Sequence, residues 1–175
     1  MQALKSGKYK VRGSVRNKDD PSKLEFLKET FEDQFEKLEL VNVDLLKPET
    51  VRAAIEGCDH VIHVASPFAL QGGLDAFVKP AVEGTNTVLQ ACLDFGIKRL
   101  IVTASMITVY GANNIKEKYT EADFSPPEGK NITPYGKSKI MAENCIIEFR
   151  KKIPNDSPLE IITIHPGFIT GNFLF

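Results

Sequence analysis

Short β-rich runs alternate with helical patterns along the chain, and this alternation limits the possible folds more than any other feature. The predicted strands are Lys8–Arg16, Leu38–Asp44, His60–Ala65, Arg99–Ser105 and Leu159–Ile164. The last three are nearly continuous apolar runs, which are typical of parallel strands covered on both faces. Strands separated by helices form parallel sheets with right-handed crossovers. The sequence therefore predicts an α/β fold built on a parallel sheet.

Proline and glycine mark the helices between these strands. The predicted helices are Pro21–Phe35, Pro48–Gly57, Asp75–Phe95 and Tyr135–Lys152. Proline is favourable in the first helical turn, where its missing N–H is not needed, and glycine often follows the last turn. Residues 112–133 are polar and rich in Pro, Gly and Asn, so we expect a long surface loop there.

The composition is that of an ordinary soluble globular protein, with 42% hydrophobic residues, 26% charged residues and a formal net charge of −1. This balance argues against a nucleic-acid partner and against an anionic membrane partner. No apolar run approaches the roughly 18 residues that span a bilayer, and the first ten residues lack a signal-peptide pattern, so we expect a cytoplasmic protein. The cysteines and histidines are dispersed, and no metal site is predicted.

Tyr135 and Lys139 are one helical turn apart and would share one face of the predicted helix. A phenol exchanges protons poorly at neutral pH, and a nearby cation favours its ionised form. Such a tyrosine can exchange a proton with an alcohol or carbonyl oxygen, which the hydroxyl of Ser105 would hold in place. This chemistry suggests hydride transfer with a nicotinamide. By itself, the spacing also fits a surface tyrosine and lysine on an amphipathic helix.

The carboxyl ends of parallel strands meet at one edge of a sheet, and ligands bind there. The predicted strand ends are Arg16, Asp44–Leu45, Ala65–Pro67, Ser105 and His165–Gly167. The helix of Tyr135 follows a loop that leaves the Ser105 end, so we expect these two residues to come together.

Several motifs occur in order along the chain. They are Val11–Arg16, Val43–Leu45, Gly57–Pro67, Val82–Asn86, Lys98–Ser105, Tyr135–Lys139 and Pro166–Gly167. On these segments the chain resembles the extended short-chain dehydrogenase/reductase family, within the NAD-dependent epimerase/dehydratase superfamily. It is most similar to the dihydroflavonol reductase and cinnamoyl-CoA reductase group. The resemblance covers nearly the whole chain, and it implies a Rossmann-like doubly wound parallel sheet.

The resemblance implies an NAD(P)-dependent oxidoreductase that acts on CH–OH groups. Matched by position, Tyr135 would pass a proton to or from the substrate oxygen, and Ser105 would hydrogen-bond that oxygen. Lys139 would favour the phenolate and hold the nicotinamide ribose. Thr103 and Thr108 are less suited to the role of Ser105. The implied partner is a small-molecule carbonyl or alcohol, and neither its identity nor the oligomeric state follows from the sequence.

The end of the first predicted strand distinguishes the two nicotinamide cofactors. Enzymes that use NAD place Asp or Glu there, whereas Arg accommodates the 2′-phosphate of NADP. Arg16 occupies this position and Lys23 follows it, so NADP (NADPH) is favoured over NAD. The resemblance implies further cofactor contacts, which come from Asp44 and Leu45 at the adenine, Val64, Ala65 and Ser66 at the ribose and diphosphate, and Pro166 and Gly167 near the nicotinamide.

Two parts of the family's pattern are absent from this sequence. One is the Gly-x-x-Gly-x-x-Gly turn after a first strand, whose amides bind the diphosphate. The other is the set of later segments that complete the substrate lobe. Without that first strand, Lys8–Arg16 and His60–Ala65 would each have an unpaired edge. We therefore expect residues 1–175 to form a single partial NAD(P)-binding Rossmann domain, a fragment that binds NADP weakly and turns over little by itself.

Two other functions share this fold. Nucleotide-sugar epimerases and dehydratases use the same Tyr, Lys and Ser set, but they usually prefer an acidic residue where Arg16 stands. A non-catalytic nucleotide-sensing or scaffolding protein would have no need of Ser105, Tyr135 and Lys139 together. Both functions are therefore less favoured than a reductase.

Overall fold

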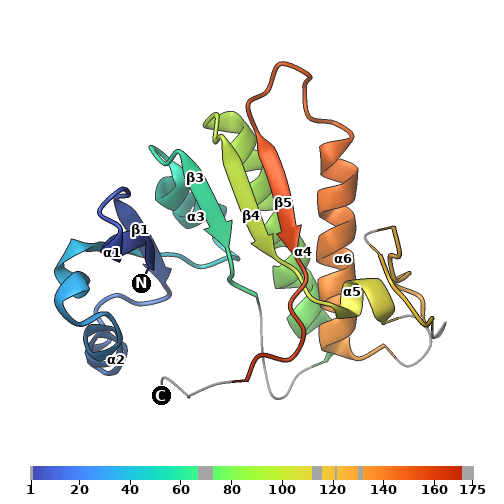
Figure 1. Cartoon of the computed structure of the whole chain (residues 1–175), viewed down its shortest axis with the longest axis horizontal. Coiled ribbons are helices and arrows are strands. Elements are labelled where there is room, and N and C mark those ends of the chain that lie inside the picture. Colours follow the sequence, from blue (N-terminus) through green and yellow to red (C-terminus); the bar gives the residue numbers. More distant parts are fainter. Residues whose placement is uncertain (1, 67–72, 112–115, 121, 130–131, 171–175) are drawn as a thin grey trace. The chain divides into compact units, whose positions relative to one another are not determined.

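The chain contains two compact units. The computed structural model describes residues 2–66, 73–111, 116–120, 122–129 and 132–170. Contacts between Cα atoms separate Met1–Ala54 and Thr170–Phe175 from Ile55–Ile169. Each unit has its own parallel sheet (Figure 1).

The first unit is built on a two-stranded parallel sheet. β1 (Val11–Val15) pairs with β2 (Leu38–Asn42) over five residues each. Asp20 caps the helix that follows β1, because its carboxylate accepts a hydrogen bond from the Ser22 amide at 3.1 Å. The helices of this unit are α1 (Gln2–Lys5), α2 (Pro21–Phe31), the 3-10 helix η1 (Glu32–Lys37) and α3 (Pro48–Ile55), which ends at the unit boundary.

The second unit holds a three-stranded parallel sheet in the order β3-β4-β5. Its strands are β3 (His60–His63), β4 (Arg99–Thr103) and β5 (Glu160–Ile164). In this register, Arg99 pairs with His60 on one side and with Glu160 on the other. All three strands run the same way, so their carboxyl ends meet at one edge, as the sequence predicts.

Two long helices pack side by side against this sheet (Figure 1). They are α4 (Leu74–Asp94) and α6 (Pro134–Arg150), and the short α5 (Ile107–Tyr110) lies against the start of α6. Alternate residues of β4 and apolar positions of both helices form the core of the unit. Its fully buried members include Leu89 and Cys92 on α4, Leu100 on β4, and Ile140 and Ile146 on α6.

The opposite face of the three-stranded sheet is exposed in the described part of the chain. Ile62 is 66% exposed and Ile164 is 52% exposed, whereas Leu100 and Val102, which have the other parity, are buried. The prediction of parallel strands is confirmed. Within this unit, α4 and α6 lie on the face of the sheet that carries His63 and Val102.

The predicted strands and helices all exist, and most are shorter than predicted, whereas α4 is shifted by one residue and α6 begins one residue early. The first strand begins at Val11 rather than Lys8, and it ends before Arg16. The predicted helix Pro21–Phe35 divides into α2 and η1, because Glu32 adopts a φ of 49°, which an α-helix does not allow. Among the described residues, β1 and β3 are edge strands of two different sheets. The unpaired edge that was expected for each of them is therefore confirmed.

The predicted surface loop 112–133 is only partly described, since residues 112–115, 121, 130 and 131 lie outside the described ranges. Ser125 in its middle is buried, which corrects the expectation of a surface loop at this point. Its amide donates to the Thr108 carbonyl at 2.8 Å, and its hydroxyl donates to the Ile107 carbonyl at 3.2 Å. The segment therefore packs onto α5.

The described residues include neither a metal-binding cluster nor a membrane span. No group of three or more His, Cys, Asp or Glu side chains in these ranges could hold a metal ion. No described helix is long and apolar enough to cross a membrane. Cys58, Cys92 and Cys145 form no disulfide bond, and burial raises the pKa of Cys92 to about 12.

Candidate active site

The N-terminus of α6 places Tyr135 in the first helical turn. Thr133 caps the helix, since its hydroxyl oxygen accepts a hydrogen bond from the Gly136 amide at 3.0 Å, and Pro134 follows the cap. A methyl group on Gly136 would lie only 2.8 Å from Cδ1 of Ile107. Because glycine allows this close approach, the start of α6 lies directly against α5.

Lys139 lies on the same face of α6 as Tyr135, as their spacing predicts. Its Nζ is 5.9 Å from the centroid of the Tyr135 ring, within the range of a cation–π contact. The same Nζ donates a hydrogen bond to the Thr103 carbonyl at 3.1 Å. The side chain is buried, and this burial lowers the pKa of Lys139 while the charge of Glu143 raises it.

Ser105 is the second residue after β4, whose last residue, Thr103, supplies the carbonyl that binds Lys139. Its half-buried Oγ accepts a hydrogen bond from the Ile107 amide at 3.4 Å. The hydroxyl of Thr108 is buried and donates to the Ser105 carbonyl at 2.9 Å, so it is already engaged. The end of β4 and the first turns of α6 therefore bring Ser105, Tyr135 and Lys139 to one region.

The turn after β5 lies beside the same region. The Pro166 carbonyl accepts a hydrogen bond from the Met106 amide at 3.0 Å. Gly167 approaches so closely that a methyl group on it would lie 3.0 Å from the sulfur of Met106. Pro166 and Gly167 thus lie next to the residue that follows Ser105.

The segment after β3 also reaches Lys139. A cavity of about 20 Å³ is lined by Ala65 and Ser66 together with Lys139, while Val64 is exposed. His63 lies at the same cavity, and burial together with the charge of Lys139 lowers its pKa to about 4.

The remaining predicted cofactor residues belong to the first unit. Arg16 is exposed directly after β1, and Lys23 is exposed in the first turn of α2. Asp44 and Leu45 are half-buried after β2, and the Asp44 carboxylate accepts a hydrogen bond from the Leu46 amide at 3.0 Å. Because β1 and β2 are parallel, all four lie toward the carboxyl edge of this sheet.

A second arginine of the first unit, Arg12, lies within β1 and is engaged in contacts along the sheet. Its guanidinium pairs with Glu39 at 2.9 Å and donates to the Ala54 carbonyl at 3.0 Å. These contacts hold Arg12 along the sheet rather than at the strand end where Arg16 lies.

Glu143 also belongs to this region, although no sequence motif pointed to it. Its carboxylate is buried one helical turn beyond Lys139, and Oε2 is 3.5 Å from Nε2 of His165. The i to i+4 step from Lys139 was the available signal, because it continues the face that begins at Tyr135.

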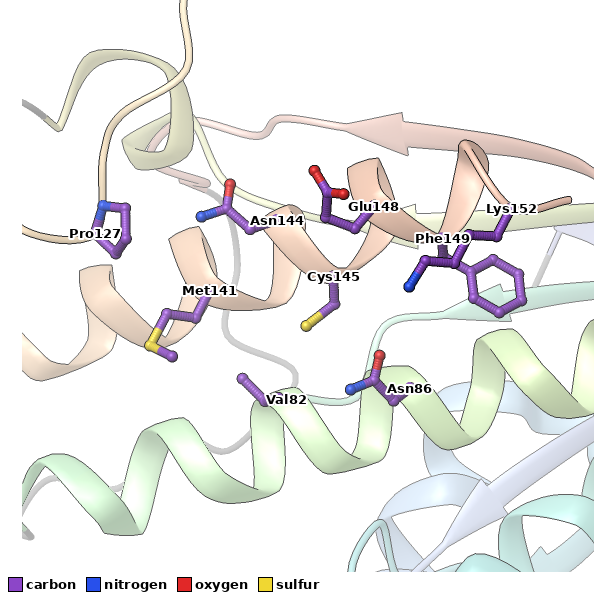
Figure 2. Close-up of a pocket in the computed structure, with 9 residues that line it drawn as sticks. All are labelled: Val82, Asn86, Pro127, Met141, Asn144, Cys145, Glu148, Phe149 and Lys152. Atoms are coloured by element: carbon purple, nitrogen blue, oxygen red, sulfur yellow. The ribbon is translucent and has the colours of Figure 1, made fainter.

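A separate groove of about 360 Å³ lies between the outer sides of α4 and α6. Figure 2 shows its lining residues, which are Val82, Asn86, Pro127, Met141, Asn144, Cys145, Glu148, Phe149 and Lys152. None of the predicted site residues is among them, so the groove is distinct from the region around Lys139.

Comparison with known proteins places these features in a family. The sequence profile of the 3-beta hydroxysteroid dehydrogenase/isomerase family matches residues 8–173. Cinnamoyl-CoA reductase 1 of Petunia hybrida is 36% identical over 173 residues, which are 95% of this chain and 49% of that protein.

Two solved structures have the same fold. Vestitone reductase from alfalfa (Medicago sativa) matches with a TM-score of 0.73 and 31% identity, over 99% of this chain and 53% of its own. Gre2 from Candida albicans, solved as a complex with NADPH, matches with a TM-score of 0.74 and 26% identity, over 95% of this chain and 53% of its own.

The chain spans about half the length of the curated relatives that it matches. The profile match covers nearly all of the 175 residues. The relatives include cinnamoyl-CoA reductases, an anthocyanidin reductase and a dihydroflavonol 4-reductase, which confirms the predicted group. The chain therefore belongs to the 3-beta hydroxysteroid dehydrogenase/isomerase family and is similar to its cinnamoyl-CoA and dihydroflavonol reductases.

Proposed function

We propose that this chain carries the catalytic and NADP-recognition residues of an oxidoreductase that interconverts a small-molecule carbonyl and its alcohol. One observation carries the proposal. The ammonium of Lys139 lies 5.9 Å from the centroid of the Tyr135 ring and is fixed to the Thr103 carbonyl, two residues before Ser105. A phenol, a cation and a hydroxyl at the carboxyl end of a parallel strand suit proton exchange with a carbonyl oxygen.

Each of the three side chains has a distinct role in this proposal. Ser105 donates a hydrogen bond to the substrate oxygen and orients it. Tyr135 delivers a proton to that oxygen in reduction and removes it in oxidation. Lys139 stabilises the phenolate of Tyr135, because opposite charge at short range favours the ionised form. When bound, NADP supplies or accepts the hydride.

The residues of the first unit fit NADP better than NAD. Arg16 presents an exposed guanidinium at the carboxyl end of β1, and no carboxylate stands at this position. A guanidinium binds a phosphate through two parallel hydrogen bonds, and Lys23 adds a second positive charge. The NADPH complex of the similar Gre2 supports the same choice. Turnover by the 175 residues alone is expected to be low, because the sequence lacks the Gly-rich diphosphate turn.

The test is reduction of an aromatic aldehyde by the purified chain at high protein concentration, followed as loss of NADPH absorbance. NADPH is expected to support turnover better than NADH. Tyr135→Phe removes the proton donor, so the rate should fall by roughly 100-fold or more. Arg16→Ala should raise the KM for NADPH and leave the KM for NADH unchanged. Lys28→Ala, in the last turn of α2, is the matched control and should change neither KM.

Three results would contradict the proposal. One is turnover that Tyr135→Phe leaves unchanged, and another is an NADPH preference that survives Arg16→Ala. The third is complete absence of NADPH binding in a folded chain, which we would check by fluorescence titration with NADH as the reference.

A further inference from the structure

Glu143 is a carboxylate enclosed by the protein. It is 2% exposed, and neither of its oxygens accepts a hydrogen bond from any residue that the structure describes. Burying a lone carboxylate is strongly unfavourable, and buried charges persist where an opposite charge or hydrogen bonds compensate them. A compensating group must therefore lie close to Glu143.

Lys139 meets this requirement from the same helix. The two residues are four apart on α6, so their side chains lie on one face. Lys139 is itself buried and needs a counter-charge for the same reason. The two charges act on one another, because the carboxylate of Glu143 opposes the effect of burial on the pKa of Lys139.

The other elements around Glu143 supply two histidines. Nε2 of His165, after β5, is 3.5 Å from the carboxylate, but it makes no hydrogen bond to a described residue. His63 of β3 is neutral at pH 7, because its pKa lies at about 4. From α4, Ala81 and Thr85 face the same cavity, and neither titrates. Lys139 is thus the lysine at this cavity whose charge acts on that of Glu143.

A small cavity lies where these side chains meet. Its volume is about 20 Å³, and its polar lining includes Thr85, Thr103, Lys139 and Glu143. A polar cavity of this size holds one water molecule, which needs two to four hydrogen-bonding partners. Such a water would accept a hydrogen bond from the ammonium and donate one to the carboxylate.

We propose that Glu143 is a positioning residue for Lys139, and that its carboxylate holds the ammonium, through one buried water, between the Thr103 carbonyl and the Tyr135 ring. The inference rests on the proposed function, because Lys139 acts there through Tyr135. Glu143 touches neither the substrate nor the reacting atoms. Its role is to keep Lys139 charged and in place despite burial.

The test measures the ionisation of Lys139 directly in the 175-residue chain. Lysine labelled with ¹³C at Cε reports the pKa by NMR, and Lys139→Arg identifies the resonance. Glu143→Gln keeps the shape of the side chain and removes its charge. The pKa of Lys139 should then shift downward, because burial continues to oppose the ammonium while the counter-charge is lost.

Two further variants make the result decisive. Glu143→Asp retains a carboxylate on a shorter side chain, so the pKa of Lys139 should lie between those of the wild type and Glu143→Gln. It also keeps the proposal testable if Glu143→Gln fails to fold. Glu148→Gln is the matched control on α6, where Glu148 is exposed and pairs with Lys151 at 2.5 Å, and it should leave Lys139 unchanged.

The proposal is overturned if Glu143→Gln leaves the pKa of Lys139 unchanged, or if Glu148→Gln shifts it equally. This measurement involves neither NADPH nor a substrate. The positioning role can therefore fail while the proposed function holds. The proposed function can also fail while Glu143→Gln still lowers the pKa of Lys139.

Discussion

The two histidines of β3 differ in burial. His60 and His63 are three residues apart in a strand, so their side chains face opposite sides of the sheet. His60 is exposed, whereas His63 is buried beside Lys139. The sequence predicts the opposite directions, but which histidine is buried depends on the side that α4 and α6 cover.

His63 should make folding stability depend on pH. Its pKa falls from 6.5 to about 4 in the folded chain, so the unfolded state binds more protons between these values. Stability should therefore be lost as the pH falls through this window, by about 2 kcal/mol between pH 7 and pH 5. Urea denaturation of the wild type and of His63→Gln at both pH values measures this contribution.

His60→Gln is the control for this prediction, because it replaces the exposed histidine of the same strand. The wild type and His60→Gln should lose more stability on acidification than His63→Gln does. Equal losses in all three proteins would show that His63 does not carry the effect.

At the scale of elements, local signals located the helices and strands better than their ends. Proline correctly marked the starts of α2 and α3, and α6 begins at Pro134, one residue before its predicted start. The end of α2 was predicted too late, because the apolar pattern continues through Phe35 although the backbone turns at Glu32. No local pattern of residues indicated that α5 exists or that Ser125 packs onto it.

The contact between α5 and α6 depends on Gly136. In Gly136→Ala, the added methyl group would lie 2.8 Å from Cδ1 of Ile107, so one helix must shift. We expect a net loss of about 1 kcal/mol in the free energy of unfolding, although alanine favours helices by a similar amount. Urea denaturation followed by circular dichroism measures it.

Ile107→Val provides the matched test, because it removes the Cδ1 atom that the new methyl group would meet. The double variant should be more stable than the sum of the two single changes predicts. Strict additivity would mean that this contact does not decide the cost at Gly136.

At the scale of the whole molecule, the two units differ in how much core they contain. Among the described residues of the first unit, the buried apolar side chains are Leu4 and Val51, whereas the second unit buries many more. An isolated two-stranded sheet is marginally stable in water. The first unit should therefore open at a lower free energy than the second.

Native-state hydrogen exchange tests this difference. The amides of β1 and β2 should exchange with a lower opening free energy than those of β4, the central strand of the larger sheet. Low concentrations of urea should narrow the gap, because unfolding of the larger unit exposes more surface and its free energy therefore falls more steeply with urea. Equal opening free energies in the two sheets would show that the whole chain unfolds as one cooperative unit.

The sequence by itself determined the order and type of the strands and of the longer helices, the parallel direction of the strands and the pairing of Tyr135 with Lys139, because hydrophobic periodicity and i to i+4 spacing are local properties of the chain. Only the tertiary structure decided that α4 and α6 cover one face of the β3-β4-β5 sheet, that His63 and Glu143 are buried, and that the Thr103 carbonyl holds Lys139. Burial is decided by contacts between segments far apart in the sequence, and no local pattern of residues records those contacts.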